Sequence, residues 1–226
     1  MTLTLPVTQG DPSYVFVYLV TYHTGGHTRP VLVEERVHSM TIDAAYVYPN
    51  EVVGLIRGGY VHNADWAKGV TKPLGEEFPS LPESFRSGVE AAYAWPNWVV
   101  GFINQGLVHH TDWGNGVTKT LQEMYPTLPS EISPTVEGAF VYSNWEVGLV
   151  RAPWVFRTSG GDSGILQNLG DQYPGMPEHF RSGVSTAYMY PNEVAGFLAG
   201  QYAYQSDWDS QQTVIHTFPS MPDDWA

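Results

Sequence analysis

The sequence repeats itself four times at a nearly constant spacing. A short segment that combines small residues with an aromatic ring recurs at steps of 47, 47 and 48 residues. Its copies are Ile42 to Tyr46, Val89 to Tyr93, Val136 to Phe140 and Val184 to Tyr188. Each copy is followed by a turn that contains Asn, by an apolar stretch with one glycine, and by an aromatic-Pro element that closes the unit. This period, with its short apolar runs and many turns, predicts one β-propeller blade per repeat.

The repeats divide the chain into a propeller and an extension. We expect residues 42–226 to form an all-β, four-bladed propeller with four antiparallel strands per blade, and residues 1–41 to lie outside it. The blades are predicted at about 42–88, 89–135, 136–183 and 184–226. In the first blade we expect strands at 42–48, 52–57, 60–64 and 70–74, a turn at Gly58-Gly59 and a short helix within 76–85. Helical solenoids have similar periods, but the 23 glycines and 17 prolines would break their helices.

The repeated residues resemble those of the hemopexin family. The pattern Phe-x-Ser-Gly-Val-x-x-Ala-Tyr occurs at 85–93 and 180–188, and Asn-Glu-Val occurs at 50–52 and 192–194. In its organisation the chain resembles the single-domain, four-bladed seed-albumin type of that family. It departs from the family pattern by lacking a cysteine to tie the first blade to the last, and by carrying glycine where the family has aromatics in the second strand. These glycines are Gly54, Gly101, Gly148 and Gly196.

The N-terminal extension contains a predicted β-hairpin. Residues 14–22 alternate so that both faces of a strand would be apolar, Gly25-Gly26 can form a turn, and Val31 to Val33 can return as a second strand. An isolated hairpin is only marginally stable in water. It should therefore dock on the propeller or pair with a second copy in a homodimer, and the sequence does not decide between the two.

An acidic charge balance limits the partners. Charged residues make up 15% of the chain, and its formal net charge is −13. This balance argues strongly against nucleic acid and anionic membranes as partners, and it favours cationic ligands such as metal ions or polyamines. The absence of cysteine excludes disulfides and thiolate metal sites. Residues 1–11 contain no basic start followed by an apolar run, which favours a cytoplasmic location over secretion.

A propeller turns the free edge of each innermost strand toward its axis. Crowding there explains the small residues Ala44-Ala45, Ala91-Ala92, Gly138-Ala139 and Thr186-Ala187. Four carbonyl groups at one level would form an oxygen ring suited to Ca²⁺ or Na⁺. The family resemblance implies one ring from Asp43, Glu90, Glu137 and Ser185, and a second from Ala45, Ala92, Ala139 and Ala187. The alternative is a channel that holds only ordered water.

Aspartate followed by tryptophan comes after the third strand in three of the units. Trp66, Trp113 and Trp208 are candidate ligand-binding residues, because an indole beside a carboxylate can stack on a sugar or hold a cation. In the alternative interpretation each ring packs on the neighbouring blade. The strand-two glycines likewise either leave shallow pockets or lie under aromatic rings. A further aromatic series, Tyr48, Trp95, Tyr142 and Tyr190, is expected between blades.

Three histidines could bind a ligand. His62 and His109 occupy equivalent positions in the third strands of the first two units, and His110 follows directly. Imidazoles can ligate a transition metal or haem iron, and the resemblance implies haem as one ligand. Adjacent strand residues point to opposite faces, so His109 and His110 do not readily share one metal. Histidines with no ligand are the alternative.

The sequence contains no recognised catalytic motif, whether Gly-x-Ser-x-Gly, a phosphate-binding glycine loop or His-Glu-x-x-His. It therefore favours a non-enzymatic binding protein with a cation in its channel. The resemblance implies a polyamine or haem as the small ligand. A multivalent carbohydrate-binding lectin and a pocket-type enzyme, such as a cyclase or isomerase, are the alternatives.

Overall fold

The computed structural model describes residues 15–24, 27–36, 41–65, 68–112, 116–133, 135–161 and 163–225. Residues 1–40 and residues 41–226 form two separate compact units. The first unit contains the predicted hairpin, in which β1 (Val15–Thr24) pairs antiparallel with β2 (His27–Arg36). The turn residues Gly25 and Gly26 lie outside the described residues. Docking or dimerisation of the hairpin stays a prediction.

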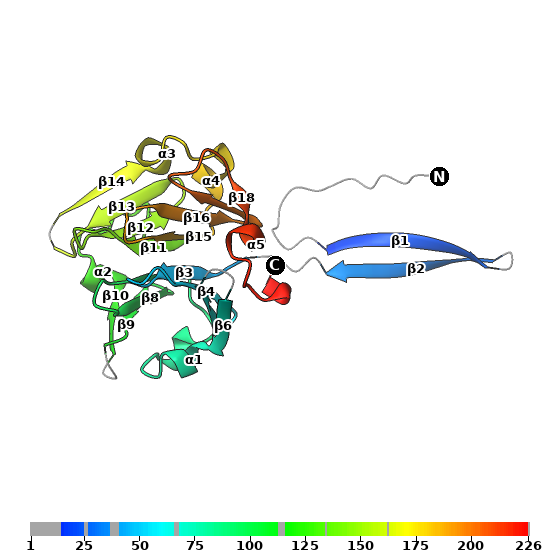
Figure 1. Ribbon diagram of the computed structural model, residues 1–226, viewed down its shortest axis with the longest axis horizontal. Coiled ribbons are helices and arrows are strands. Elements are labelled where there is room, and N and C mark those ends of the chain that lie inside the picture. The colour runs from blue at the N-terminus through cyan, green and yellow to red at the C-terminus, as the bar shows by residue number, and fades with distance from the viewer. Residues whose placement is uncertain are drawn as a thin grey trace. The chain divides into compact units, whose positions relative to one another are not determined.

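The second unit is a β-propeller of four blades, each a four-stranded antiparallel sheet in chain order (Figure 1). The first blade consists of β3 (Ala44–Val47), β4 (Val53–Arg57), β5 (Tyr60–Asp65) and β6 (Lys68–Pro73). The second consists of β7 (Ala91–Ala94), β8 (Val100–Asn104), β9 (Leu107–His110) and β10 (Val117–Thr120). The third consists of β11 (Gly138–Val141), β12 (Val147–Arg151), β13 (Trp154–Thr158) and β14 (Gly164–Asn168). The fourth consists of β15 (Thr186–Met189), β16 (Ala195–Ala199), β17 (Tyr202–Gln205) and β18 (Gln212–Thr213). Because the inner strands β3, β7, β11 and β15 contact one another in a closed ring, the predicted fold class is confirmed.

A short connector follows the outer strand of each blade. All four connectors begin with a one-turn helix, namely α1 (Leu74–Glu77), α2 (Leu121–Met124), α3 (Leu169–Gln172) and α5 (Val214–Thr217). Within the described residues three contain a second helical segment, namely η1 (Glu83–Phe85), α4 (Glu178–Gly183) and η2 (Asp223–Trp225). The single helix expected within 76–85 is two segments, because Pro79 and Pro82 lie between them. No helix in the described part of the chain is long and apolar enough to cross a membrane.

An aromatic ring of each inner strand lies over a glycine of the adjacent strand. The register pairs Tyr46 with Gly54, Tyr93 with Gly101, Phe140 with Gly148 and Tyr188 with Gly196. A methyl group at any of these glycines would lie well under 3.0 Å from a ring carbon, closer than real side chains come. Aromatic packing therefore fills the glycine positions, as one of the two interpretations predicted. The alternative of shallow pockets at these glycines is wrong.

The same rings join successive blades, at contacts that we call seams. Tyr46 packs with Phe102 of the second blade, and Tyr188 packs with Leu55 of the first blade, so the last seam resembles the earlier ones. The C-terminal connector completes this last seam. Trp225 contacts His62 with ring centroids 6.2 Å apart, as Phe85 contacts its equivalent His109 at 5.9 Å in the first seam. Burial of aromatic rings thus closes the propeller of a chain that has no cysteine.

Replacing Gly196 with Ala should destabilise the propeller, because the new methyl group would overlap the fully buried ring of Tyr188. Overpacking of this kind costs about 1–3 kcal/mol. Gly183→Ala is the matched control, since a methyl group there meets nothing within 4 Å. Urea unfolding should show the loss for Gly196→Ala alone. Equal stability of the two variants would contradict the packing described above.

Candidate functional site

The hydrogen bonds of the inner strands determine which backbone groups face the axis. The Tyr48 amide donates to the Val52 carbonyl at 2.9 Å, which makes Tyr46 and Ala44 the hydrogen-bonded partners of β4. Since bonded and non-bonded pairs alternate, Ala45 carries backbone groups on the free edge. The equivalent amides of Trp95, Tyr142 and Tyr190 make the same bond in the other blades. The residues predicted for the second carbonyl ring all lie on free edges, and they are Ala45, Ala92, Ala139 and Ala187.

The inner strands leave a narrow neck in the channel. A cavity of about 10 Å³ lies between them, lined by residues of all four blades. This is about the least volume that one water molecule needs. Among the described residues no three His, Asp or Glu side chains come together to hold a metal ion. Backbone oxygen suits a hard cation such as Ca²⁺ or Na⁺. The residues present therefore fit a cation held by carbonyl groups, and they do not fit one held by side chains.

One end of the channel opens into a cavity of about 540 Å³, which we call the acidic mouth. The residues predicted for the first ring line it, and they are Asp43, Glu90, Glu137 and Ser185. The Asp43 carboxylate accepts a hydrogen bond from the Gly58 amide, and the Glu137 carboxylate accepts one from the Ala152 amide, each at 2.8 Å. Two of the acidic side chains are thus held by turns of their own blades, and they contribute charge to the mouth.

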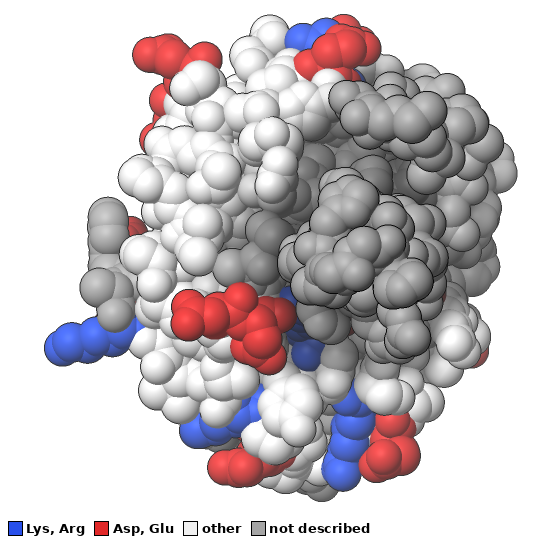
Figure 2. All heavy atoms as spheres, turned by 90° about the vertical axis from the view of Figure 1, so that its right-hand side faces the viewer, with Lys and Arg blue, Asp and Glu red and all other residues white. Residues whose placement is uncertain are grey.

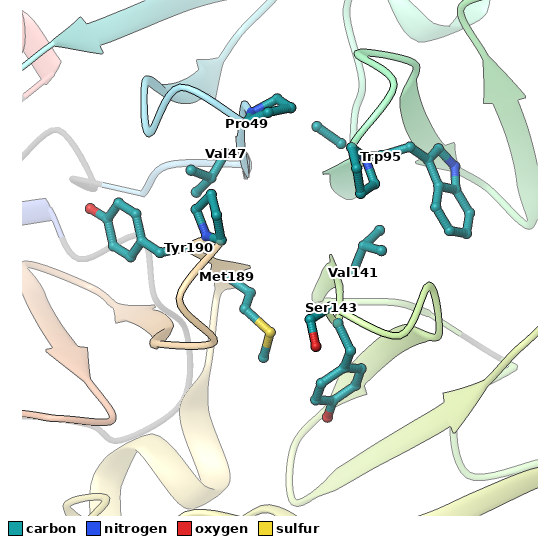
Figure 3. Close-up of a pocket in the computed structure, with 11 residues that line it drawn as sticks. Val47, Pro49, Trp95, Val141, Ser143, Met189 and Tyr190 are labelled. Atoms are coloured by element: carbon teal, nitrogen blue, oxygen red, sulfur yellow. The ribbon is translucent and has the colours of Figure 1, made fainter.

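The other end opens into a cavity of about 270 Å³, which we call the aromatic mouth (Figure 3). Turns that follow the inner strands line it. Figure 3 shows Val47, Val141 and Met189 nearer its centre, and the rings of Trp95 and Tyr190 farther out. The aromatic series predicted between blades belongs to or packs on the cores of the four seams. Three of its members, Trp95, Tyr142 and Tyr190, also line this mouth.

Each of the four turns that line the aromatic mouth contains one residue with a left-handed backbone. We call Glu51, Trp98, Trp145 and Glu193 the rim residues; their φ angles are 68°, 71°, 68° and 66°. In each turn the preceding Asn accepts a hydrogen bond from the amide that follows the rim residue, at 3.2 to 3.4 Å. A positive φ is uncommon outside glycine and is strained for a bulky residue. Backbone strain of this kind is found preferentially at functional sites.

Three of the rim residues contact the preceding blade. Trp98 lies against Tyr48 with ring centroids 5.2 Å apart, and Trp145 stacks on Trp95 at 5.9 Å. Glu193 accepts a hydrogen bond from the Ser143 hydroxyl. Trp98 and Trp145 remain 48% and 50% exposed. Blades two and three thus provide an aromatic half of the rim, and blades four and one provide an acidic half.

Charge is not gathered into one patch on the face that Figure 2 shows. Acidic and basic side chains lie there in small separate groups, with uncharged residues between them. Exposed charges farther apart than about 10 Å are largely screened by salt. Attraction of a cationic ligand therefore depends on carboxylates close to its site, such as those of the rim and the acidic mouth.

The arrangement of blades matches solved structures. A hemopexin-fold protein from cow pea aligns with a TM-score of 0.68 and 17% identity, over 80% of this chain and 96% of that one. A seed albumin from Lathyrus sativus aligns with a TM-score of 0.70 and 14% identity, over 83% and 99% of the two chains. This chain has the hemopexin fold. A plant lectin with two metal binding sites, from Cicer arietinum, aligns with a TM-score of 0.67 and 13% identity, over 79% and 96%. No protein-family model matches the chain, and no curated protein matches its sequence.

Within this hemopexin fold the predicted histidines are spread over different seams. His62 and His109 are buried, and each Nδ1 lies within 2.9 Å of a threonine hydroxyl on the next strand. His110 Nε2 lies 2.6 Å from the Tyr93 hydroxyl. Burial lowers the pKa of all three imidazoles, which favours their neutral form. Haem binding by these residues stays a prediction.

Of the three predicted tryptophans, Trp208 belongs to the described residues, and Trp66 and Trp113 lie outside them. Trp208 is half-buried against the core of the last seam, and it also lines a cavity there. Its amide donates to the Gln205 carbonyl at 2.9 Å. The Trp208 ring therefore packs between blades, as one interpretation predicted, and it also lines a cavity, as the ligand-binding interpretation requires.

The acidic mouth generates a pH-dependent prediction. Burial raises the pKa of Asp43 above its ordinary value, and the Gly58 amide and Arg57 oppose only part of that rise. The folded chain then binds this proton more tightly than the unfolded chain, so stability falls as pH rises above the ordinary carboxyl pKa of about 3.9. Asp43→Asn should match the parent protein at acid pH and exceed its stability at pH 7. Because solvent screens this partly exposed group, the gain should stay below about 1 kcal/mol.

Urea unfolding in EDTA buffer at several pH values measures this difference. Glu83→Gln, in which the same charge is removed from a side chain that is 89% exposed, is the control for net charge. A variant that is less stable than the parent at pH 7, relative to this control, would contradict the assigned cause.

Proposed function

We propose that this chain is a non-enzymatic binding module that takes a small organic cation of the polyamine class at its aromatic mouth. One observation carries the proposal. The rim pairs two exposed indole rings with two carboxylates, and all four residues stand in a strained backbone conformation. An ammonium group is attracted both by the face of an indole ring and by carboxylates.

The apolar lining at the centre of the mouth supports a cation with an apolar body. Methylene groups can pack on Val47, Val141 and Met189 near the centre. Ammonium groups would extend beyond this lining to Trp98 or Trp145 and to Glu193, which belong to the turns that line the mouth. Desolvation of the methylene chain contributes about 0.8 kcal/mol per buried group. The acidic half of the rim would repel an anionic ligand, which favours a polyamine over haem at this mouth.

A carbohydrate is the second candidate for the aromatic mouth. Exposed indole rings can stack on the apolar face of a sugar, and carboxylates accept hydrogen bonds from its hydroxyl groups. The two candidates differ in their dependence on charge. Binding of a polyamine should weaken steeply with added salt, whereas binding of a neutral sugar should not.

Spermidine titration by isothermal calorimetry tests the proposed ligand class. Trp98→Ala and Trp145→Ala should each weaken binding about twofold to thirtyfold, the range that one cation–π contact spans. Glu193→Gln should weaken binding as well, most at low salt. Glu83→Gln, with the same charge change on the first connector, should bind as the parent does. Unchanged affinity in all three rim variants would refute the site, and a neutral glycoside that responds to them in place of spermidine would favour the lectin.

A structural cation in the channel neck is the other part of the proposal. The free-edge carbonyls and the negative acidic mouth support Ca²⁺ or Na⁺ there. When bound, the ion would neutralise converging carbonyl dipoles and hold the inner strands together. Native mass spectrometry should detect one ion per chain, and Ca²⁺ at 100 times its Kd should add about 2.7 kcal/mol to the stability in EDTA-free buffer. If the mass shows no ion and Ca²⁺ does not shift the unfolding midpoint, the cation is refuted and the alternative of a channel with ordered water is favoured.

A further inference from the structure

The seam between the fourth and first blades contains a cavity of about 420 Å³, which we call the seam pocket. Its floor is apolar and comes from both blades, with Val53 and Ala64 on one side and Phe218 on the other. Its walls are polar and include the amide side chains of Gln205 and Gln212. The half-buried indole of Trp208 also lines it. The seam pocket thus combines an aromatic face with side-chain amides and with the carboxylates of Glu51 and Asp207. Both kinds of group can form hydrogen bonds with hydroxyl groups.

The equivalent space in the first seam is filled by an ion pair. Asn63 corresponds to Gln205, because each is paired in register with the strand-two glycine of its blade. Glu77, the last residue of α1, accepts a hydrogen bond from the Asn63 amide at 3.0 Å and pairs with Lys72 at 3.0 Å. These contacts close the first seam with long polar side chains.

The second and third seams are filled in other ways. His110 takes the corresponding position in the second seam, where it contacts the Tyr93 hydroxyl. Arg157 takes it in the third seam, where the guanidinium lies 4.2 Å from the ring centroid of Tyr142 and pairs with Glu146. In both seams a large side chain at this position bonds to its own blade.

The fourth seam stays open because its connector helix ends in a short side chain. Helices α1, α2 and α3 end in Glu77, Met124 and Gln172, whereas α5 ends in Thr217. The Thr217 hydroxyl donates back to the carbonyl of Thr213, the residue before α5, at 3.0 Å. The short side chain at the end of α5, together with Gln205 at the position that Arg157 takes in the third seam, accounts for the seam pocket.

Trp208 is held in place before any ligand arrives. Its amide closes a turn onto the Gln205 carbonyl at 2.9 Å, and the adjacent Ser206 both donates to and accepts from the backbone of Ala195 at 2.8 and 3.0 Å. The indole packs against the core of the seam. A preformed aromatic wall lowers the entropy that a ligand loses on binding.

From this geometry we propose that the seam pocket binds one carbohydrate ring of pyranose size. The apolar face of a sugar stacks on an indole, and its hydroxyl groups both donate and accept hydrogen bonds, as the side-chain amides do. The volume of the seam pocket, about 420 Å³, lies in the range of small-molecule sites. The seam pocket shares Tyr190 with the lining of the aromatic mouth and Glu51 with the rim, but Trp208, Gln205 and Thr217 line the seam pocket alone. This site predicts one sugar per chain, in contrast to the several expected of equivalent blade pockets.

Calorimetric titration of the full chain with methyl glycosides of glucose, galactose, mannose and N-acetylglucosamine tests the proposal. At least one should bind with a stoichiometry of one. Trp208→Ala should weaken its binding at least tenfold by removing the stacking face. Thr217→Gln, which introduces the side chain that ends α3, should weaken it as much by filling the pocket while Trp208 stays in place. Thr127→Gln makes the same change at an exposed connector residue and should have no effect.

The outcomes separate this site from the aromatic mouth. Unfolding midpoints identify any variant that has lost its fold. If Trp208→Ala does not fold, Thr217→Gln still tests the pocket. Failure of all four glycosides to bind, or equal binding after both pocket substitutions, overturns the proposal. Loss of spermidine binding in Thr217→Gln would instead assign the pocket to a cation and also overturn it. Spermidine binding that depends on Trp98 and not on Thr217 leaves the two sites distinct.

Discussion

The packing of one aromatic ring over one glycine, repeated in every blade, sets the geometry of the propeller. Without a Cβ at Gly54, the Tyr46 ring can lie against the neighbouring strand and still present its outer side to the second blade. The ring therefore fixes both the pleat of one sheet and its distance from the next. The width of the channel follows from that distance, since the inner strands can approach the axis no closer than their packed neighbours allow.

The same repeated geometry explains why strain collects at the aromatic mouth. Each inner strand leaves the ring of packed side chains through a tight turn whose third residue must take a positive φ. Glycine would adopt it without strain. This chain instead places Trp98 and Trp145 there, and both rings remain half-exposed although each contacts the preceding blade. Packing on the preceding blade covers about half of each ring, and the ligand proposed for this mouth would cover the exposed half.

The fold could be predicted from the sequence because the same residue pattern occurs in four successive repeats. The positions of the strands, of the turn that Gly58-Gly59 forms in the first blade and of the small residues at the axis all recur in register, so the four units support one prediction. The rim residues were not identified from the sequence. They occupy the same position in every unit, directly after the turn Asn, but their side chains differ between units. Trp98 and Trp145 occupy the position that contains Glu in the other two blades. The sequence signal was present, but only the positive φ angles show that all four positions share one strained geometry.

The seam pocket lay further beyond prediction, for a physical reason. It depends on Thr217 being shorter than Glu77 at the end of an equivalent helix, and on Gln205 leaving space that Arg157 fills in another seam. Neither difference can be interpreted from the sequence, because only the structure shows that the helix ends face the seams. The near-fourfold repetition of the blades provides the stable scaffold. A ligand can occupy one seam only if the side chains of that seam differ from those of the other three. In this fold, therefore, the residues that agree between blades are those that pack, and the residues that disagree at a shared position, such as Thr217 and Trp98, are those that can select a ligand.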